Sequence, residues 1–205
     1  MKIYKTIMNF VVIITLLLVS LIGVNAEEDH DNKDKPGSNE IQNRAWMYKH
    51  GKLINGPRNM LYTVNGGATA YTYNINIGVK NWMYTGYDNP IYMTPVSSNY
   101  GSTIDFYNYK DNDNTVAYTQ VYNSKNQPID YKNDYLWAKI LFNDRYKTDQ
   151  SINHNATSAH EIGHVLGLPH NDSAYSIMYG ANKGRKVVSP QKVDNERVVE
   201  LYGRY

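Results

Sequence analysis

Three histidines and one glutamate in the last quarter of the chain stand at a spacing that suits metal chemistry. His160 and His164 are four residues apart, so on a helix they lie on one face and can direct two imidazoles at a single ion. Glu161 lies beside that ion without being needed as a ligand. His170 follows after a predicted turn and can supply a third nitrogen. Three protein ligands that leave one position open are typical of catalytic zinc, whereas structural zinc takes four.

The alternative is that these histidines are unrelated residues of a core helix. The chain has only 6 His in 205 residues, and three of them fall in one stretch that reads H-E-x-x-H-x-x-G-x-x-H. Gly167 stands where a helix can end in the left-handed conformation, which Gly adopts most easily. Pro169 prevents the helix from continuing, so the chain can bring His170 back toward the ion. The pattern therefore favours a metal site.

Hydrophobic patterning predicts the elements that would position this helix. The predicted strands are Met60–Val64, 91–93, 103–109, 115–122 and 135–142. Residues 69–84 fit both an alternating strand and a helical stripe, so periodicity alone leaves that segment open. Residues 123–134 are predicted to form a loop, and residues 111–114 a turn.

Two helices are predicted near the end of the chain. The motif helix can be capped by Asn153 or Asn155. Its apolar face, formed by Ala159, Ile162, Gly163 and Leu166, lies opposite the metal edge. Ser189 followed by Pro190 predicts the start of a last helix.

The first part of the chain is predicted to lie outside the folded domain. Residues 1–26 carry lysines at the start, an apolar run over 10–24 and a small-residue cleavage site, which together indicate a secretory signal peptide. The alternative is an uncleaved membrane anchor. Residues 27–45 are polar and predict a linker or a short pro-segment. Residues 46–205 are long enough for one domain with its own core.

Overall composition narrows the classes of partner. The formal net charge is +2, which gives no indication of nucleic-acid binding. The chain has 0 Cys, so an exported domain would be held by packing and metals without disulfides. Abundant Tyr without Cys weakly suggests a bacterial source.

The motif, together with the segment Ser176-Ile177-Met178-Tyr179, resembles the metzincin zinc peptidases. In that class a methionine turn lies beneath the metal. The eight-residue step from His170 to Met178 resembles the matrixin branch. Gly180 stands where other branches carry a tyrosine that reaches the metal, so the chain is less similar to those.

The resemblance implies an α+β fold of the metzincin, or zincin-like, type. This fold has a twisted, mostly parallel five-stranded sheet with one antiparallel edge strand, three helices that include the active-site helix, and a Met-turn. Its order of elements places a helix at residues 69–84, and we therefore expect a helix there. The expected domain is thus a metzincin-type catalytic domain over residues 46–205.

The resemblance and the chemistry assign the same roles to the motif residues. His160, His164 and His170 are expected to hold one catalytic zinc, and Glu161 to act as the general base. Met178 is expected to form an apolar floor beneath the ligands.

The resemblance also implies where a substrate binds. Tyr179 and residues 180–188 are expected to line the pocket for the substrate side chain after the scissile bond. An extended substrate is expected to pair with the edge strand at 115–122, where Ala117 and Tyr118 are the candidate binding residues.

The chain also departs from the matrixin pattern. Matrixins block their zinc with a pro-segment cysteine, which this chain lacks, so Asp29, Asp31 or Asp34 are candidate substitutes. The edge strand has no histidine for a structural zinc, which predicts a single zinc. Ca2+ is a candidate second ion at residues 111–114, although the spacing there favours a plain turn. His50 and His154 have no partners at ligand spacing and are predicted to lie at the surface.

The expected function is that of a secreted, monomeric zinc endopeptidase whose partners are protein or peptide substrates. We expect no nucleic-acid partner and no stable membrane association once the signal peptide is removed. One alternative is a highly specific processing or toxin-like zinc peptidase. Another is a non-catalytic binding module on a metzincin scaffold, against which the intact Glu161 argues, because such a module needs no base.

Overall fold

The computed structural model describes residues 50–204. The predicted signal peptide, the predicted linker and the three candidate aspartates of the latch therefore lie outside the described residues. Within the described range, no helix combines the length and apolar character needed to cross a membrane. The strands are β1 (Met60–Val64), β2 (Met93–Pro95), β3 (Ile104–Tyr109), β4 (Ala117–Tyr122), β5 (Pro128–Ile129) and β6 (Trp137–Asn143). The α-helices are α2 (Thr72–Met83), α3 (His154–Val165) and α4 (Lys192–Tyr202), and short 3-10 helices are η1 (Gly66–Tyr71), η2 (Asp144–Tyr146) and η3 (Ala181–Lys183).

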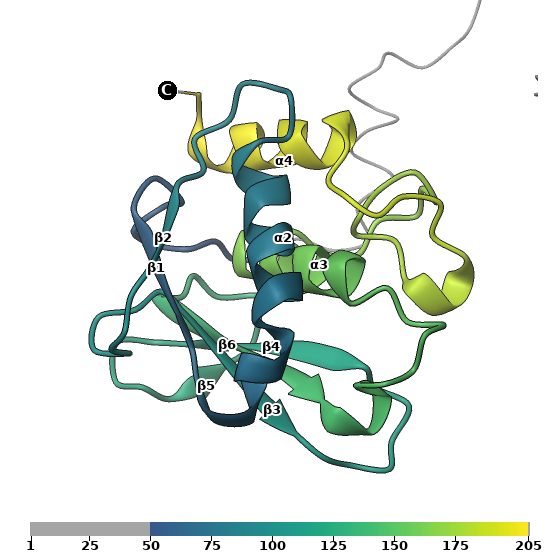
Figure 1. The fold of residues 1–205 in the computed structure, drawn as a ribbon. Coiled ribbons are helices and arrows are strands. Elements are labelled where there is room, and N and C mark those ends of the chain that lie inside the picture. Colours follow the sequence, from purple (N-terminus) through teal and green to yellow (C-terminus); the bar gives the residue numbers. More distant parts are fainter. Residues whose placement is uncertain (1–49, 205) are drawn as a thin grey trace, which may run out of the picture. The chain divides into compact units, whose positions relative to one another are not determined.

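The strands form one mixed sheet in the order β2-β1-β3-β6-β4-β5 (Figure 1). The pairs β1–β2, β1–β3 and β3–β6 are parallel, and β4 is antiparallel to both β6 and β5. This arrangement confirms the predicted α+β fold of the metzincin type. The predicted number of five strands was wrong, because the sheet has six.

The additional strand, β5, lies in the segment that was predicted to be a loop. It has only two residues, too few to produce a recognisable alternation in the sequence. β5 forms because the outer edge of β4 presents unpaired backbone groups, which a neighbouring segment can satisfy. Its residues pair with Val121 and Tyr122 at the end of β4.

The segment at 69–84, which periodicity left open, is helical, as the family arrangement predicts. It comprises the end of η1 and all of α2, and it buries Ile75, Gly78, Val79 and Trp82. The ring nitrogen of Trp82 donates a hydrogen bond of 2.7 Å to the carbonyl of Ala159 on α3. At Gly78 a Cβ would lie 2.8 Å from the Cβ of Ser158, so the absence of a side chain lets the two helices pack closely. The helical stripe therefore prevails because it packs against the motif helix.

Other boundaries differ by about two residues from the sequence prediction. Helix α3 begins after Asn153, whose side chain accepts a hydrogen bond of 3.0 Å from the backbone N–H of Ala156. Helix α4 begins after Gln191 and not at Pro190, because Asp194 forms a capping box with Gln191. β2 begins at Met93, two residues later than predicted.

The turn at residues 111–114 is held by side chains of this chain. Arg145 donates to the carbonyls of Asn112 and Asp113, and the Tyr146 hydroxyl donates to the latter at 2.8 Å. The side-chain amide of Asn143 donates to the carbonyl of Asp111 at 3.1 Å. The carboxylates of Asp111 and Asp113 also accept from the backbone N–H groups of Asn112 and Thr115. These local hydrogen bonds are those of a plain turn.

Candidate metal centre and active site

Helix α3 and the turn after it place the three motif histidines. His160 and His164 lie one turn apart on α3, and the helix ends at Leu166. Gly167 has a φ of 82°, the left-handed conformation predicted from the motif. A Cβ at this position would also lie 2.9 Å from the carbonyl oxygen of Gly51. Position 167 can therefore hold only glycine. The turn reverses the chain and brings His170 close to His160 and His164.

The histidine side chains converge on one point. Their ligand atoms lie within 4.8 Å of one another, and within the described range no other group of potential ligands gathers in this way. Nδ1 of His160 lies 2.7 Å from the carbonyl oxygen of Ile177, and Nδ1 of His164 lies 2.9 Å from that of Leu168. Because a carbonyl only accepts, both Nδ1 atoms carry the proton, which leaves each Nε2 lone pair free for a metal.

Electrostatics favours the neutral form that a metal needs. Burial lowers the pKa of His164 and of His170 to about 4. Burial, followed by the charge of His164, holds the pKa of His160 well below its ordinary value. All three imidazoles are therefore neutral near pH 7, and neutral imidazole is the ligand form. In donor type, charge and orientation these residues fit a zinc ion.

Glu161 is buried beside this cluster and faces β4. The hydroxyl of Thr119 lies 2.7 Å from Oε2 of Glu161 and 3.1 Å from its main-chain oxygen. Burial raises the pKa of Glu161 to about 7, against the opposing effects of the Thr119 hydrogen bond and the Arg185 charge. A carboxyl group with such a pKa can both accept and release a proton near neutral pH.

The Met-turn packs directly beneath α3. Met178 is fully buried, and a Cβ on Gly163 would lie 2.2 Å from its sulfur atom, so only glycine allows this approach. The turn is fixed by Asp194 of α4, which is fully buried and accepts from the Ser176 hydroxyl. The same carboxylate accepts from the backbone N–H of Ile177 at 3.0 Å. Since Ile177 bonds His160, Asp194 supports a ligand from a distance.

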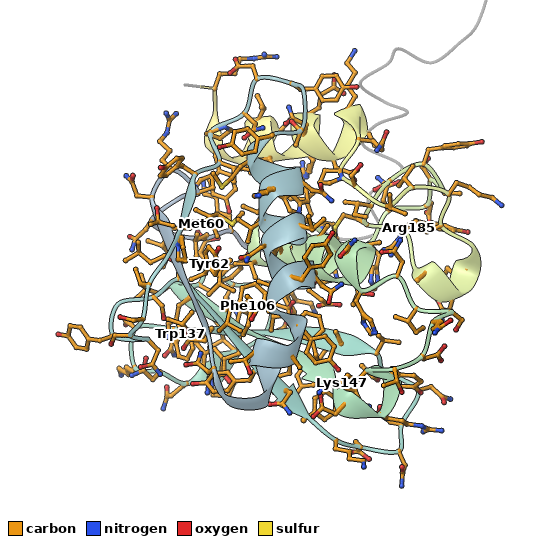
Figure 2. All side chains as sticks on the ribbon, viewed as in Figure 1. Met60, Tyr62, Phe106, Trp137, Lys147 and Arg185 are labelled. Atoms are coloured by element: carbon orange, nitrogen blue, oxygen red, sulfur yellow. The ribbon has the colours of Figure 1, made fainter. Side chains whose placement is uncertain are left out.

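The segment after the Met-turn contacts the same carbonyl. Arg185 lies on this segment (Figure 2). It donates a hydrogen bond of 3.0 Å to the carbonyl of Ile177, the carbonyl that also contacts Nδ1 of His160. Tyr179 is half-buried, and its carbonyl lies 3.5 Å from the same guanidinium group. The segment at 180–188 thus places the positive charge of Arg185 near Glu161.

The predicted substrate-binding residues of β4 lie on different faces. Ala117 is half-buried and shares a face with Thr119, which contacts Glu161. Tyr118 is 41% exposed and points to the opposite face, where its ring packs edge-on against Tyr109 at 5.3 Å between centroids.

The prediction that His50 and His154 are surface residues was wrong, since both are half-buried. His50 stacks on Tyr131 at 5.1 Å, and its ring centroid lies 6.5 Å from that of His164. His154 packs edge-on against Tyr71. Only tertiary contacts bring these rings together, so spacing along the chain could not reveal them.

Sequence reasoning also missed Thr119, Tyr131 and Asp194 as neighbours of the site. Asp194 left a weak signal, because an acidic residue three positions after a helix cap is typical of a capping box. Thr119 left none, because nothing in a strand pattern identifies which residue meets a helix 42 positions away.

The sequence profile of the matrixin family matches residues 95–203, which is more than half of the 205-residue chain. The chain belongs to the matrixin family. The matched residues include the histidine motif, the Met-turn and the strands β3, β4, β5 and β6. A search of curated proteins returns no match. Membership of this family, together with the histidine cluster, supports a zinc metallopeptidase.

We expect Asp194→Asn to loosen the Met-turn. An amide cannot accept all the hydrogen bonds that the buried carboxylate accepts, so the free energy of unfolding should fall by about 2–3 kcal/mol. Zinc affinity should fall by about tenfold or more, as for other residues that support ligands indirectly. Urea unfolding and zinc titration measure these two effects. Asp172→Asn, at an exposed position near the turn, is the control, and equal behaviour of the two variants would contradict this role.

We expect the metal-free protein to lose stability between pH 7 and pH 4.5. An unfolded histidine takes up a proton near pH 6.5, whereas folded His164 and His170 do so only near pH 4. The unfolded state therefore binds more protons as the pH falls, and it becomes more favourable. Glu161 makes the opposite contribution to the free energy of unfolding, because its pKa is raised to about 7 in the folded state. The three histidines together outweigh this single group.

Urea unfolding in the presence of a chelator, at several pH values across this window, measures the change. A free energy of unfolding that stays constant or rises on acidification would show that the histidines are not buried in the neutral form.

Proposed function

We propose that this protein is a zinc-dependent endopeptidase that hydrolyses peptide bonds in proteins or peptides outside the cell that produces it. The observation that carries this proposal is the cluster of three neutral, oriented histidines beside a buried glutamate whose pKa is about 7. Membership of the matrixin family supports the same class of reaction. The signal-peptide pattern of residues 1–26 supports export.

His160, His164 and His170 would hold the zinc, the first two through their Nε2 atoms. Zinc bound there would lower the pKa of a water molecule and polarise the peptide carbonyl. Glu161 accepts the proton of the attacking water and then delivers it to the nitrogen of the leaving amine. Thr119 occupies Oε2 of the carboxylate, so Oε1 is the oxygen that remains for proton transfer.

The residues around these groups keep them in place and define the cleft. Met178 and Gly163 set the distance between the Met-turn and α3. Tyr179 and the segment that follows are proposed to line the pocket for the substrate residue after the scissile bond.

Glu161→Ala should abolish peptidase activity while leaving the zinc site intact. Loss of a general base typically costs about 10²–10⁴ in rate, whereas the three histidines are unchanged. Cleavage of casein, with and without a chelator, and measurement of bound zinc test this expectation. If the variant cleaves casein as fast as the unaltered protein, Glu161 is not the base. If the unaltered, zinc-loaded protein cleaves no peptide bond, the proposed function is wrong.

Thr119→Val should lower kcat by roughly tenfold or more and change KM little. The hydroxyl bonds a charged group in a buried site, and such bonds contribute about 1.5–3 kcal/mol. Thr119→Ser keeps the hydroxyl and should restore most of the activity, which separates positioning of Glu161 from a simple packing effect. Bound zinc and the unfolding midpoint serve as controls. Equal loss in both variants would contradict a role for the hydroxyl.

A further inference from the structure

The outer edge of β4 is the surface on which an extended substrate would have to pair. The carbonyls of Val116 and Tyr122 accept hydrogen bonds from Asn143 and Leu136, so even-numbered residues direct their backbone groups inward, toward β6. In an antiparallel pair these directions alternate along the strand. The backbone groups of Ala117, Thr119 and Val121 therefore face outward.

Most of this outward edge is already occupied by the chain itself. Val121 pairs with Ile129 of β5. The hydroxyl of Tyr131 donates a hydrogen bond to the carbonyl of Thr119. Ala117 precedes Thr119 and Val121 in the strand, and β5 does not extend as far as Ala117. The free edge is thus much shorter than the edge strand predicted at 115–122, and shorter than β4 itself.

Tyr131 is held firmly in this position. Its carbonyl accepts a hydrogen bond of 2.6 Å from the backbone N–H of Gly51, and its ring stacks on that of His50. The ring centroid lies 6.0 Å from that of the metal ligand His164. Tyr131 therefore covers the edge immediately beside the reaction centre, which Thr119 marks through its bond to Glu161.

We propose that the cleft is one-sided because β5 and Tyr131 together cover one half of the edge, with Tyr131 at the position nearest Glu161. A substrate can pair with β4 on the Ala117 side of Glu161, but not on the Val121 side. Antiparallel pairing is the more stable form, and β4 pairs in this way with both β5 and β6. An antiparallel substrate places the residues before its scissile bond on the Val121 side.

The preferred substrates are thus polypeptides with few residues on the amino side of the cleaved bond and a longer segment on the carboxyl side. This inference rests on the proposed peptidase function. It identifies Tyr131 as the residue that determines specificity, and it favours a narrow, processing-type substrate range.

Synthetic peptides test the proposal with the zinc-loaded protein. Cleavage of a mixture of tryptic casein peptides, mapped by mass spectrometry, first identifies one cleaved bond. Peptides that keep this bond are then lengthened by one residue at a time on the amino side, or on the carboxyl side. We expect kcat/KM to fall about tenfold once the amino side reaches the covered edge, because the added residues meet β5 and the Tyr131 hydroxyl and can pair with β4 only by displacing them. Lengthening the carboxyl side should not lower it.

Tyr131→Phe tests the cause. This variant keeps the ring stacked on His50 but frees the Thr119 carbonyl, so it should raise kcat/KM for the amino-extended peptides about fivefold to tenfold and leave the short peptides unchanged. Tyr122→Phe removes a hydroxyl from the opposite face of β4, where the ring stacks on Trp137, and is the matched control.

Three results would overturn the proposal. Equal kcat/KM at every amino-side length would show that the cleft is open on both sides, while the peptidase function stands. A limit on the carboxyl side would show that the substrate runs in the other direction. Absence of cleavage of any peptide would remove the peptidase function, and this inference with it.

Discussion

The hydrogen bond from His160 to the carbonyl of Ile177 is the interaction on which the site depends. It fixes the tautomer of a candidate metal ligand, and it joins helix α3 to the turn that carries Met178. The same carbonyl accepts a bond from Arg185, and the N–H of the same residue donates to Asp194 on α4. One peptide unit thus connects a ligand, the loop beside the cleft and the last helix.

A second constraint is the balance of charge in a buried place. Burial favours neutral histidines and a protonated Glu161, and both tendencies appear in the shifted pKa values. Neutral histidines suit a metal, but a permanently protonated glutamate would not act as a base. Thr119 and Arg185 oppose that tendency through a hydrogen bond and a nearby positive charge. The arrangement leaves the carboxyl group close to the pH at which it can exchange a proton in both directions.

The edge of the sheet shows how the fold can restrict a reaction without touching the reacting atoms. An exposed strand edge is a general template for pairing with another chain. Here β5 and the Tyr131 hydroxyl satisfy much of that edge, and the segment that begins at His50 supports Tyr131. The part of the edge that stays free for a substrate is therefore shorter than the motif alone implies.

The sequence by itself determined the candidate metal ligands and the candidate base, because their arrangement depends on short spacings. Residues four apart share a helix face whatever surrounds them, and Gly167 has the positive φ that the motif requires. The order of the main strands and the last helix also followed from local patterning. Residues 69–84 did not, because strand and helix periods overlapped there until packing on α3 decided between them. The fifth strand, the Thr119–Glu161 bond, the Asp194 support and the position of His50 came only from the tertiary structure. Each of these features joins residues that are far apart in the chain. Such contacts depend on how whole helices and strands pack, and local spacing in the sequence does not predict this packing.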